Sequence, residues 1–112
     1  MKKEIRDGKV AILFSPGFGA GWFSWHEVEE LLFDPSIVSM VEQMNSCDPS
    51  CYEDWLDDIV DYTKTRYGVN VYVGGAENLQ VRWLPEGTKF YIDEYDGSES
   101  IMTLDDLEWR KA

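Results

Sequence analysis

The tripeptide Asp-Pro-Ser occurs twice in this chain, at residues 34–36 and 48–50, and each copy has the form of a helix start. An aspartate at the N-cap accepts hydrogen bonds from free backbone amides, and proline suits the first helical position because no donor is needed there. The sequence therefore predicts two helices, of which the second ends near Tyr67, before Gly68. Their apolar faces are Ile37, Val38, Val41 and Met44 in the first helix, and Tyr52, Trp55, Leu56, Ile59, Val60 and Thr63 in the second.

A third helix is predicted just before these two. Ser24 and Glu27 have the spacing of a capping box, in which each side chain binds the backbone amide of the other residue. Phe23 and Val28 have the spacing of the hydrophobic contact that often accompanies such a start. This pattern predicts a helix over residues 25–33, with Ser24 as its cap.

Strand signals occupy the two ends of the chain. Residues 9–15 form a short apolar run, and Asp96-Gly97 is a two-residue hairpin signal between the expected strands 89–95 and 98–104. Further strands are expected at 69–73, 79–84 and 107–111. The predicted fold is a single α+β domain over residues 1–112. It has an N-terminal strand, three short helices, and then an antiparallel sheet of four to five strands with the helices packed on one face.

Charge is distributed unevenly along the 112 residues, whose formal net charge is −12. Residues 1–9 hold four cations and two anions, a net +2, so the rest of the chain carries −14. Such a body repels nucleic-acid phosphates and anionic membranes, so direct binding to either is not expected. The charge either serves solubility alone or attracts a protein partner with a basic surface.

The N-terminal sequence and the cysteines indicate a cytoplasmic protein. No apolar segment follows the basic N-terminus, and the longest apolar run, residues 10–14, is far too short to span a bilayer. Cys47 and Cys51 are four residues apart, and no second cysteine pair is present to complete a zinc site. We expect both residues to be buried thiols in a reducing compartment.

Signals for catalysis are weak in this sequence. His26 is the only histidine, and no Gly-x-Ser-x-Gly nucleophile motif occurs. The sequence therefore offers no combination of a nucleophile, a base and a residue that orients the base. We expect no enzyme activity, no cofactor and no metal site.

The segment SPGFGAGWFSW, residues 15–25, lies between a predicted strand and a predicted helix, where phosphate-binding loops occur. Its glycines have the spacing G-x-G-x-G instead of G-x-G-x-x-G, and no lysine or arginine occurs between Val10 and Thr63. A phosphate site is therefore not expected. Two interpretations stay open: a tight turn whose aromatic residues fill the core, or a site for a flat, nucleotide-like ligand. The candidate ligand-binding residues are Phe18, Gly19, Gly21, Trp22 and Trp25.

Two groups of acidic residues are candidates for binding a protein partner. One group lies on the helix after Asp48, opposite its apolar face, and the other surrounds the predicted hairpin. Each group is either a solvated surface or an interaction surface. The candidates are Asp54, Asp57, Asp58 and Asp61 on the helix, and Asp93, Glu94, Asp96 and Glu99 on the hairpin.

The segments SPGFGAGWFSW and DEYDGSESI, residues 15–25 and 93–101, together resemble a group of small bacteriophage and prophage proteins over most of the chain. That group has no settled activity, so the resemblance assigns no site residues. It implies a small acidic accessory protein in the host cytoplasm that modulates a host factor, as counter-defence inhibitors do. We therefore expect a non-enzymatic protein that binds its partner through an acidic surface. The alternatives are a protein that sequesters a nucleotide-like signal and a structural component of the virion, which predicts homo-oligomers.

Overall fold

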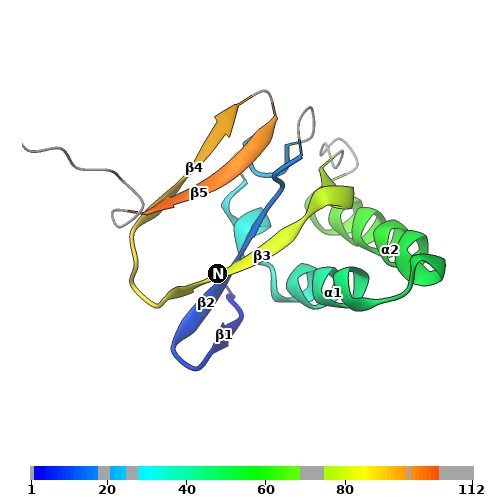
Figure 1. The fold of residues 1–112 in the computed structure, drawn as a ribbon, viewed down its shortest axis with the longest axis horizontal. Helices are drawn as coiled ribbons and strands as arrows, with labels where there is room; N and C mark the ends of the chain where they lie inside the picture. The colour runs from blue at the N-terminus through cyan, green and yellow to red at the C-terminus, as the bar shows by residue number, and fades with distance from the viewer. Residues whose placement is uncertain (1, 18–20, 25–27, 69–74, 96, 104–112) are drawn as a thin grey trace, which may run out of the picture.

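The computed structural model describes residues 2–17, 21–24, 28–68, 75–95 and 97–103. Figure 1 shows the arrangement of strands and helices within these ranges. The strands are β1 (Ile5–Arg6), β2 (Lys9–Phe14), β3 (Gln80–Pro85), β4 (Phe90–Tyr95) and β5 (Ser98–Thr103). The α-helices are α1 (Pro35–Ser46) and α2 (Pro49–Tyr67), and two short 3-10 helices are η1 (Glu29–Leu32) and η2 (Ala76–Asn78).

The described strands form two antiparallel sheets. One sheet has the order β1-β2-β3, and the other consists of β4 and β5. Pairing of β2 with β3 aligns Ala11 with Trp83 and Leu13 with Val81, so the strand before the helices lies beside the first described strand after them. The α+β class is therefore confirmed, whereas the prediction of one sheet of four to five strands is wrong for the described residues.

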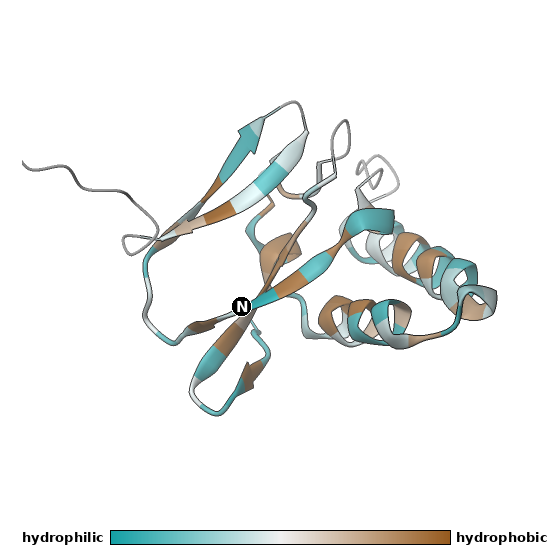
Figure 2. Cartoon of the chain, in the orientation of Figure 1, coloured by the Kyte–Doolittle hydropathy of each residue, from teal (hydrophilic) through white to brown (hydrophobic). Residues whose placement is uncertain are grey.

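The central strand β2 is buried on both faces, which explains its unbroken apolar sequence. Ala11 and Leu13 face a core cluster that also contains buried residues of α1 and α2. Val10 and Ile12 face a second cluster, which includes Ile101 of β5. The three-stranded sheet therefore lies between the helices and the β4–β5 hairpin. Figure 2 shows apolar residues along β2 and on both helices.

The starts and ends of α1 and α2 largely match the prediction. The Asp34 carboxylate accepts hydrogen bonds from the amides of Ser36 and Ile37, and the whole predicted apolar face of α1 is buried. α2 ends at Tyr67, as predicted, and Gly68 follows with a positive φ of 118°. The side chain of Asp48, by contrast, makes no capping hydrogen bond, so this part of the prediction is wrong.

The predicted helix over residues 25–33 is wrong over its described part. Residues 25–27 lie outside the described residues, and η1 is a single 3-10 turn whose N-cap, Val28, makes no side-chain capping bond. Ser24 does not cap a helix there, because its amide and its hydroxyl both donate to the carboxylate of Glu99. A partner that is 75 residues away in sequence thus replaces the local capping pattern.

An Asp-Gly pair separates β1 from β2, and a second one separates β4 from β5 in the sequence. The predicted hairpin around Asp96-Gly97 is confirmed for its arms, in which Tyr95 pairs with Ser98, while Asp96 itself lies outside the described residues. β1 was not predicted, although Asp7-Gly8 has the same hairpin signal. Asp7 and Gly8 both have positive φ, 52° and 75°, as a two-residue hairpin turn of this type requires. The strands expected at 69–73 and 107–111 lie outside the described residues.

The two cysteines are not the buried thiols that the sequence suggests. The sulfur atoms of Cys47 and Cys51 are joined as a disulfide, with the Cα atoms 6.2 Å apart. Cys47 ends α1, Cys51 lies in the first turn of α2, and both residues are only half-buried. The turn between the helices places the two side chains together at the surface, where the sequence pattern alone indicates core packing.

Candidate functional site

The glycine-rich segment is held by a buried carboxylate from the other end of the chain. Glu99 of β5 is 1% exposed, and its Oε1 accepts the amide of Ser15 at 2.9 Å. Its Oε2 accepts the amide of Trp22 at 3.0 Å and both the amide and the hydroxyl of Ser24 at 2.8 Å. The backbone amide of Glu99 in turn donates to the carbonyl of Ser15. One side chain therefore joins the two ends of this segment to β5.

Glycine is needed where this segment meets the residues before η2. Gly21 has a φ of 103°, a conformation that other residues rarely adopt. A Cβ atom on Gly75 would collide with the backbone carbonyl of Gly21. The hydroxyl of Ser15 donates to the carbonyl of Gly75 at 3.0 Å, which closes the same contact. These glycines are explained by close packing of two chain segments.

Trp22 fills the core and does not line an open slot. It is fully buried, and its indole Nε1 donates to the carbonyl of Leu31 at 2.7 Å. It belongs to the same apolar cluster as Leu13. Gly21 is also buried, and Phe18, Gly19 and Trp25 lie outside the described residues. For the described part of the segment, the structure supports the tight turn with a core aromatic.

The acidic face of α2 is exposed to solvent. We use this name for Glu53, Asp54, Asp57, Asp58 and Asp61, whose side chains are all exposed. In the part of the chain that the structure describes, no lysine or arginine nitrogen lies within ion-pair distance of these carboxylates. The ion pairs found there join Arg6 to Glu4 and to Glu42 instead.

The acidic residues of the hairpin are divided between different environments. Asp93 and Glu94 are exposed, and a Glu94 oxygen accepts the amide of Gly97 at 2.6 Å. Asp96 lies outside the described residues. Glu99, predicted to bind a partner, is buried, and four donors occupy its carboxylate, so it is not available to a partner. In Figure 1, α2 and the hairpin lie on opposite sides of β2 and β3, so the two acidic groups do not form one continuous face.

A second buried carboxylate joins α1 to the end of α2, through tyrosine contacts that were not predicted from the sequence. Asp34 is 6% exposed and accepts hydrogen bonds from the hydroxyls of Tyr62 at 2.9 Å and Tyr67 at 2.5 Å, besides the two amides of α1. These residues line part of an open pocket of about 900 Å³. Burial, reinforced by the negative charge of Asp34, raises the pKa of both phenols. The sequence held one signal for this contact: the spacing of Tyr62 and Tyr67 places both near the apolar face of α2, which packs against the rest of the fold.

The raised tyrosine pKa values give a pH-dependent stability. In the unfolded chain both phenols ionise near pH 10, so their contribution to the unfolding free energy is constant below that pH and falls above it. Tyr67→Phe should cost about 1–3 kcal/mol at neutral pH, through the lost bond to a charged acceptor, and should make this fall shallower. Urea denaturation at about pH 8 and about pH 10.5 measures both effects. An equal fall in the variant and the wild type would contradict the role assigned to Tyr67.

The remaining chemistry of the described surface is limited. Within the described ranges, no group of three or more histidine, cysteine, aspartate or glutamate side chains is placed to hold a metal ion. No helix there has the length and apolar character needed to cross a membrane. No family model matches this chain, and no curated protein or solved structure shows significant similarity to it. Among the predicted sites, the acidic face of α2 is therefore the best candidate for binding a partner, because its carboxylates are exposed.

Proposed function

We propose that this chain is a non-enzymatic binding protein that covers a basic surface of another protein with the acidic face of α2. The observation that carries the proposal is the exposure of five carboxylates on one helix face, with no lysine or arginine of the described residues within ion-pair distance. The resemblance to small phage and prophage proteins suggests that the partner is a host factor, which this chain would inhibit or sequester. Binding alone achieves this effect, and no catalytic group is required.

The charge pattern of α2 lowers the stability of the helix itself. Asp54 and Asp58, and likewise Asp57 and Asp61, are like charges four residues apart, which destabilise a helix by a few tenths of a kcal/mol per pair. A surface that serves solubility alone is best built from interspersed charges of both signs. A face of one sign is what electrostatic steering toward a basic partner requires.

The fold presents this face as a rigid surface. α2 has 19 residues, and its opposite side packs on the core through Ile59 and Thr63, which are both fully buried. Lys64 and Arg66 lie in the last turn, where positive charge complements the helix dipole, and so the acidic face occupies the preceding turns. A partner can therefore meet the carboxylates without any reordering of the helix.

Neutralising the helix face should abolish binding without unfolding the protein. In the variant Asp54→Asn, Asp57→Asn, Asp58→Asn and Asp61→Asn, the net charge changes from −12 to −8. Capture of host proteins from a bacterial lysate at low salt should fall at least about tenfold, because steering and charge pairing are both lost. Thermal stability should stay equal or rise slightly, since the repulsion within α2 is removed.

A matched variant separates this face from net charge. Asp7→Asn, Glu29→Gln, Glu77→Gln and Glu86→Gln change the charge by the same amount at exposed positions on other elements. This control should retain most of the binding. If the helix variant still captures the same partners as the wild type, or if both variants lose binding equally, the acidic face of α2 is not the binding surface.

A further inference from the structure

We propose that Cys47 and Cys51 form a reversible thiol–disulfide exchange site, which reacts at Cys47 with small neutral or cationic thiols and disulfides. The pair lies at the surface turn between α1 and α2, and Glu53 of the acidic face borders the same pocket as Cys47. The distance between its Cα atoms, 6.2 Å, lies within the range that a disulfide spans. The exchange is independent of the proposed binding function.

Backbone carbonyls that could accept a hydrogen bond from each reduced thiol already lie close to the two sulfurs. If the bond is reduced, the thiol of Cys51 lies 3.2 Å from the carbonyl of Asp48, to which it can donate. The thiol of Cys47 lies 3.3 Å from the same carbonyl and 3.5 Å from that of Met44. Reduction would therefore leave each thiol with a carbonyl acceptor within reach in the existing turn, which favours a reversible site.

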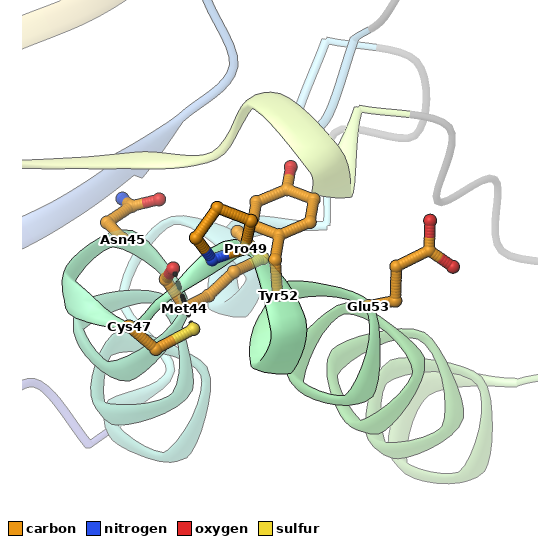
Figure 3. A pocket seen from close by; sticks show the side chains of 6 residues that line it. All are labelled: Met44, Asn45, Cys47, Pro49, Tyr52 and Glu53. Carbon is orange, nitrogen blue, oxygen red and sulfur yellow. Dashed lines mark hydrogen bonds between the residues drawn. The ribbon is translucent and has the colours of Figure 1, made fainter.

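Access to the pair favours attack on Cys47. This residue lines an open pocket of about 390 Å³ together with Met44, Asn45, Pro49, Tyr52 and Glu53, whereas Cys51 is not among the lining residues. Figure 3 shows these side chains around the turn between the two helices. A small thiolate that enters the pocket thus meets the sulfur of Cys47 first.

The position of Cys51 makes it the better leaving group. It lies in the first turn of α2, where free amides and the helix dipole stabilise a thiolate. An incoming thiolate RS⁻ bonds to Cys47 Sγ, the Sγ–Sγ bond breaks, and its electron pair stays on Cys51 as a thiolate. A second RS⁻ then attacks the R-group sulfur of the mixed disulfide, which releases RSSR and the Cys47 thiolate. In total, two thiols are oxidised to one disulfide and the protein gains two electrons; oxidation by RSSR is the reverse.

The charge around the pocket selects the reagent. Glu53 lines it, the exposed carboxylates of Asp48 and Asp54 are neighbours in sequence, and the whole chain carries −12. This field repels anionic thiols such as glutathione and attracts cationic ones such as cysteamine. We therefore expect oxidation of the reduced protein by cystamine to be about tenfold faster than by glutathione disulfide at low salt, with the difference shrinking at high salt.

The experiment follows the full chain by mass spectrometry. Reduced wild-type protein is mixed with cystamine, quenched with acid at intervals, and alkylated; the closed disulfide should form, with a transient adduct on Cys47. In Cys51→Ser the adduct on Cys47 should accumulate, because no second thiol displaces it. The oxidised wild type mixed with cysteamine should open through the same adduct, located by peptide fragmentation.

Several results would overturn the proposal. One is a wild-type protein that keeps two free thiols in excess cystamine, and another is a disulfide that cysteamine does not open. An adduct found first on Cys51 would contradict the assigned direction of attack. Equal rates with cystamine and glutathione disulfide at low salt would contradict the electrostatic selection.

Discussion

Glu99→Gln should lower the free energy of unfolding by about 2–4 kcal/mol, although it changes only one carboxylate oxygen to an amide nitrogen. The Glu99 carboxylate accepts from the amides of Ser15, Trp22 and Ser24 and from the Ser24 hydroxyl. The NH₂ group of glutamine is a donor, so in either orientation it must face at least one of these N–H groups. A buried amide is then left without a partner, and the other bonds lose their charge assistance.

A matched control for this variant lies on the neighbouring strand. Asp93→Asn makes the same change of charge and chemistry at an exposed position of β4, and should alter the unfolding free energy by less than about 0.5 kcal/mol. Urea denaturation of the two variants beside the wild type gives the comparison. If Glu99→Gln is as stable as Asp93→Asn, the carboxylate does not hold the glycine-rich segment.

Trp22→Ala should cost about 3–5 kcal/mol, the range for removal of a large buried aromatic side chain. Trp22 is fully buried and packs in the apolar cluster formed by β2 and the helices. Its indole N–H donates to the carbonyl of Leu31. Truncation therefore leaves a cavity and also an unpaired carbonyl. A tryptophan that lined an open ligand slot would be replaced at much lower cost, because solvent could fill the space.

Trp83→Ala is the control for the second variant. Trp83 is half-buried in β3, where the guanidinium of Arg6 stacks at 4.9 Å from its ring. Its truncation should cost less than half as much as that of Trp22, because water replaces part of the lost contact. Denaturant unfolding measures both variants. Equal costs, or a larger cost for Trp83, would contradict the core position of Trp22.

Local signals were sufficient to predict the elements whose partners are near in sequence. The N-cap of Asp34 and the turn at Asp96-Gly97 depend on bonds that span a few residues, and both the helix and the hairpin arms were predicted correctly. β1 was missed because a strand of two residues is too short to show an apolar period, even though the Asp7-Gly8 hairpin signal was present. The predicted helix over residues 25–33 is wrong over its described residues, 28–33, and Ser24 does not cap it because Glu99 accepts both of its hydrogen bonds.

The roles of the candidate site residues depended on contacts that sequence spacing does not show. Glu99 lies in Ser98-Glu99-Ser100, which has the composition of a solvated hairpin, and so it was grouped with the exposed acids. Strand alternation places it on the same face as Ile101 and Thr103, which are both buried, and this was the signal for an inward position. The exposure of Asp54, Asp57, Asp58 and Asp61 was predictable, because helical periodicity alone separates them from the apolar face.

The central structural claim is that the Glu99 carboxylate holds the described parts of the glycine-rich segment against β5. Amide hydrogen exchange followed by NMR tests it directly at Trp22 and Ser24, whose N–H groups donate to that carboxylate. The structure predicts slow exchange at both amides, comparable with that of Leu13 in β2, and loss of this protection in Glu99→Gln. Exchange at Trp22 and Ser24 as fast as in an unfolded peptide, with Leu13 protected, would show an open loop and contradict the claim.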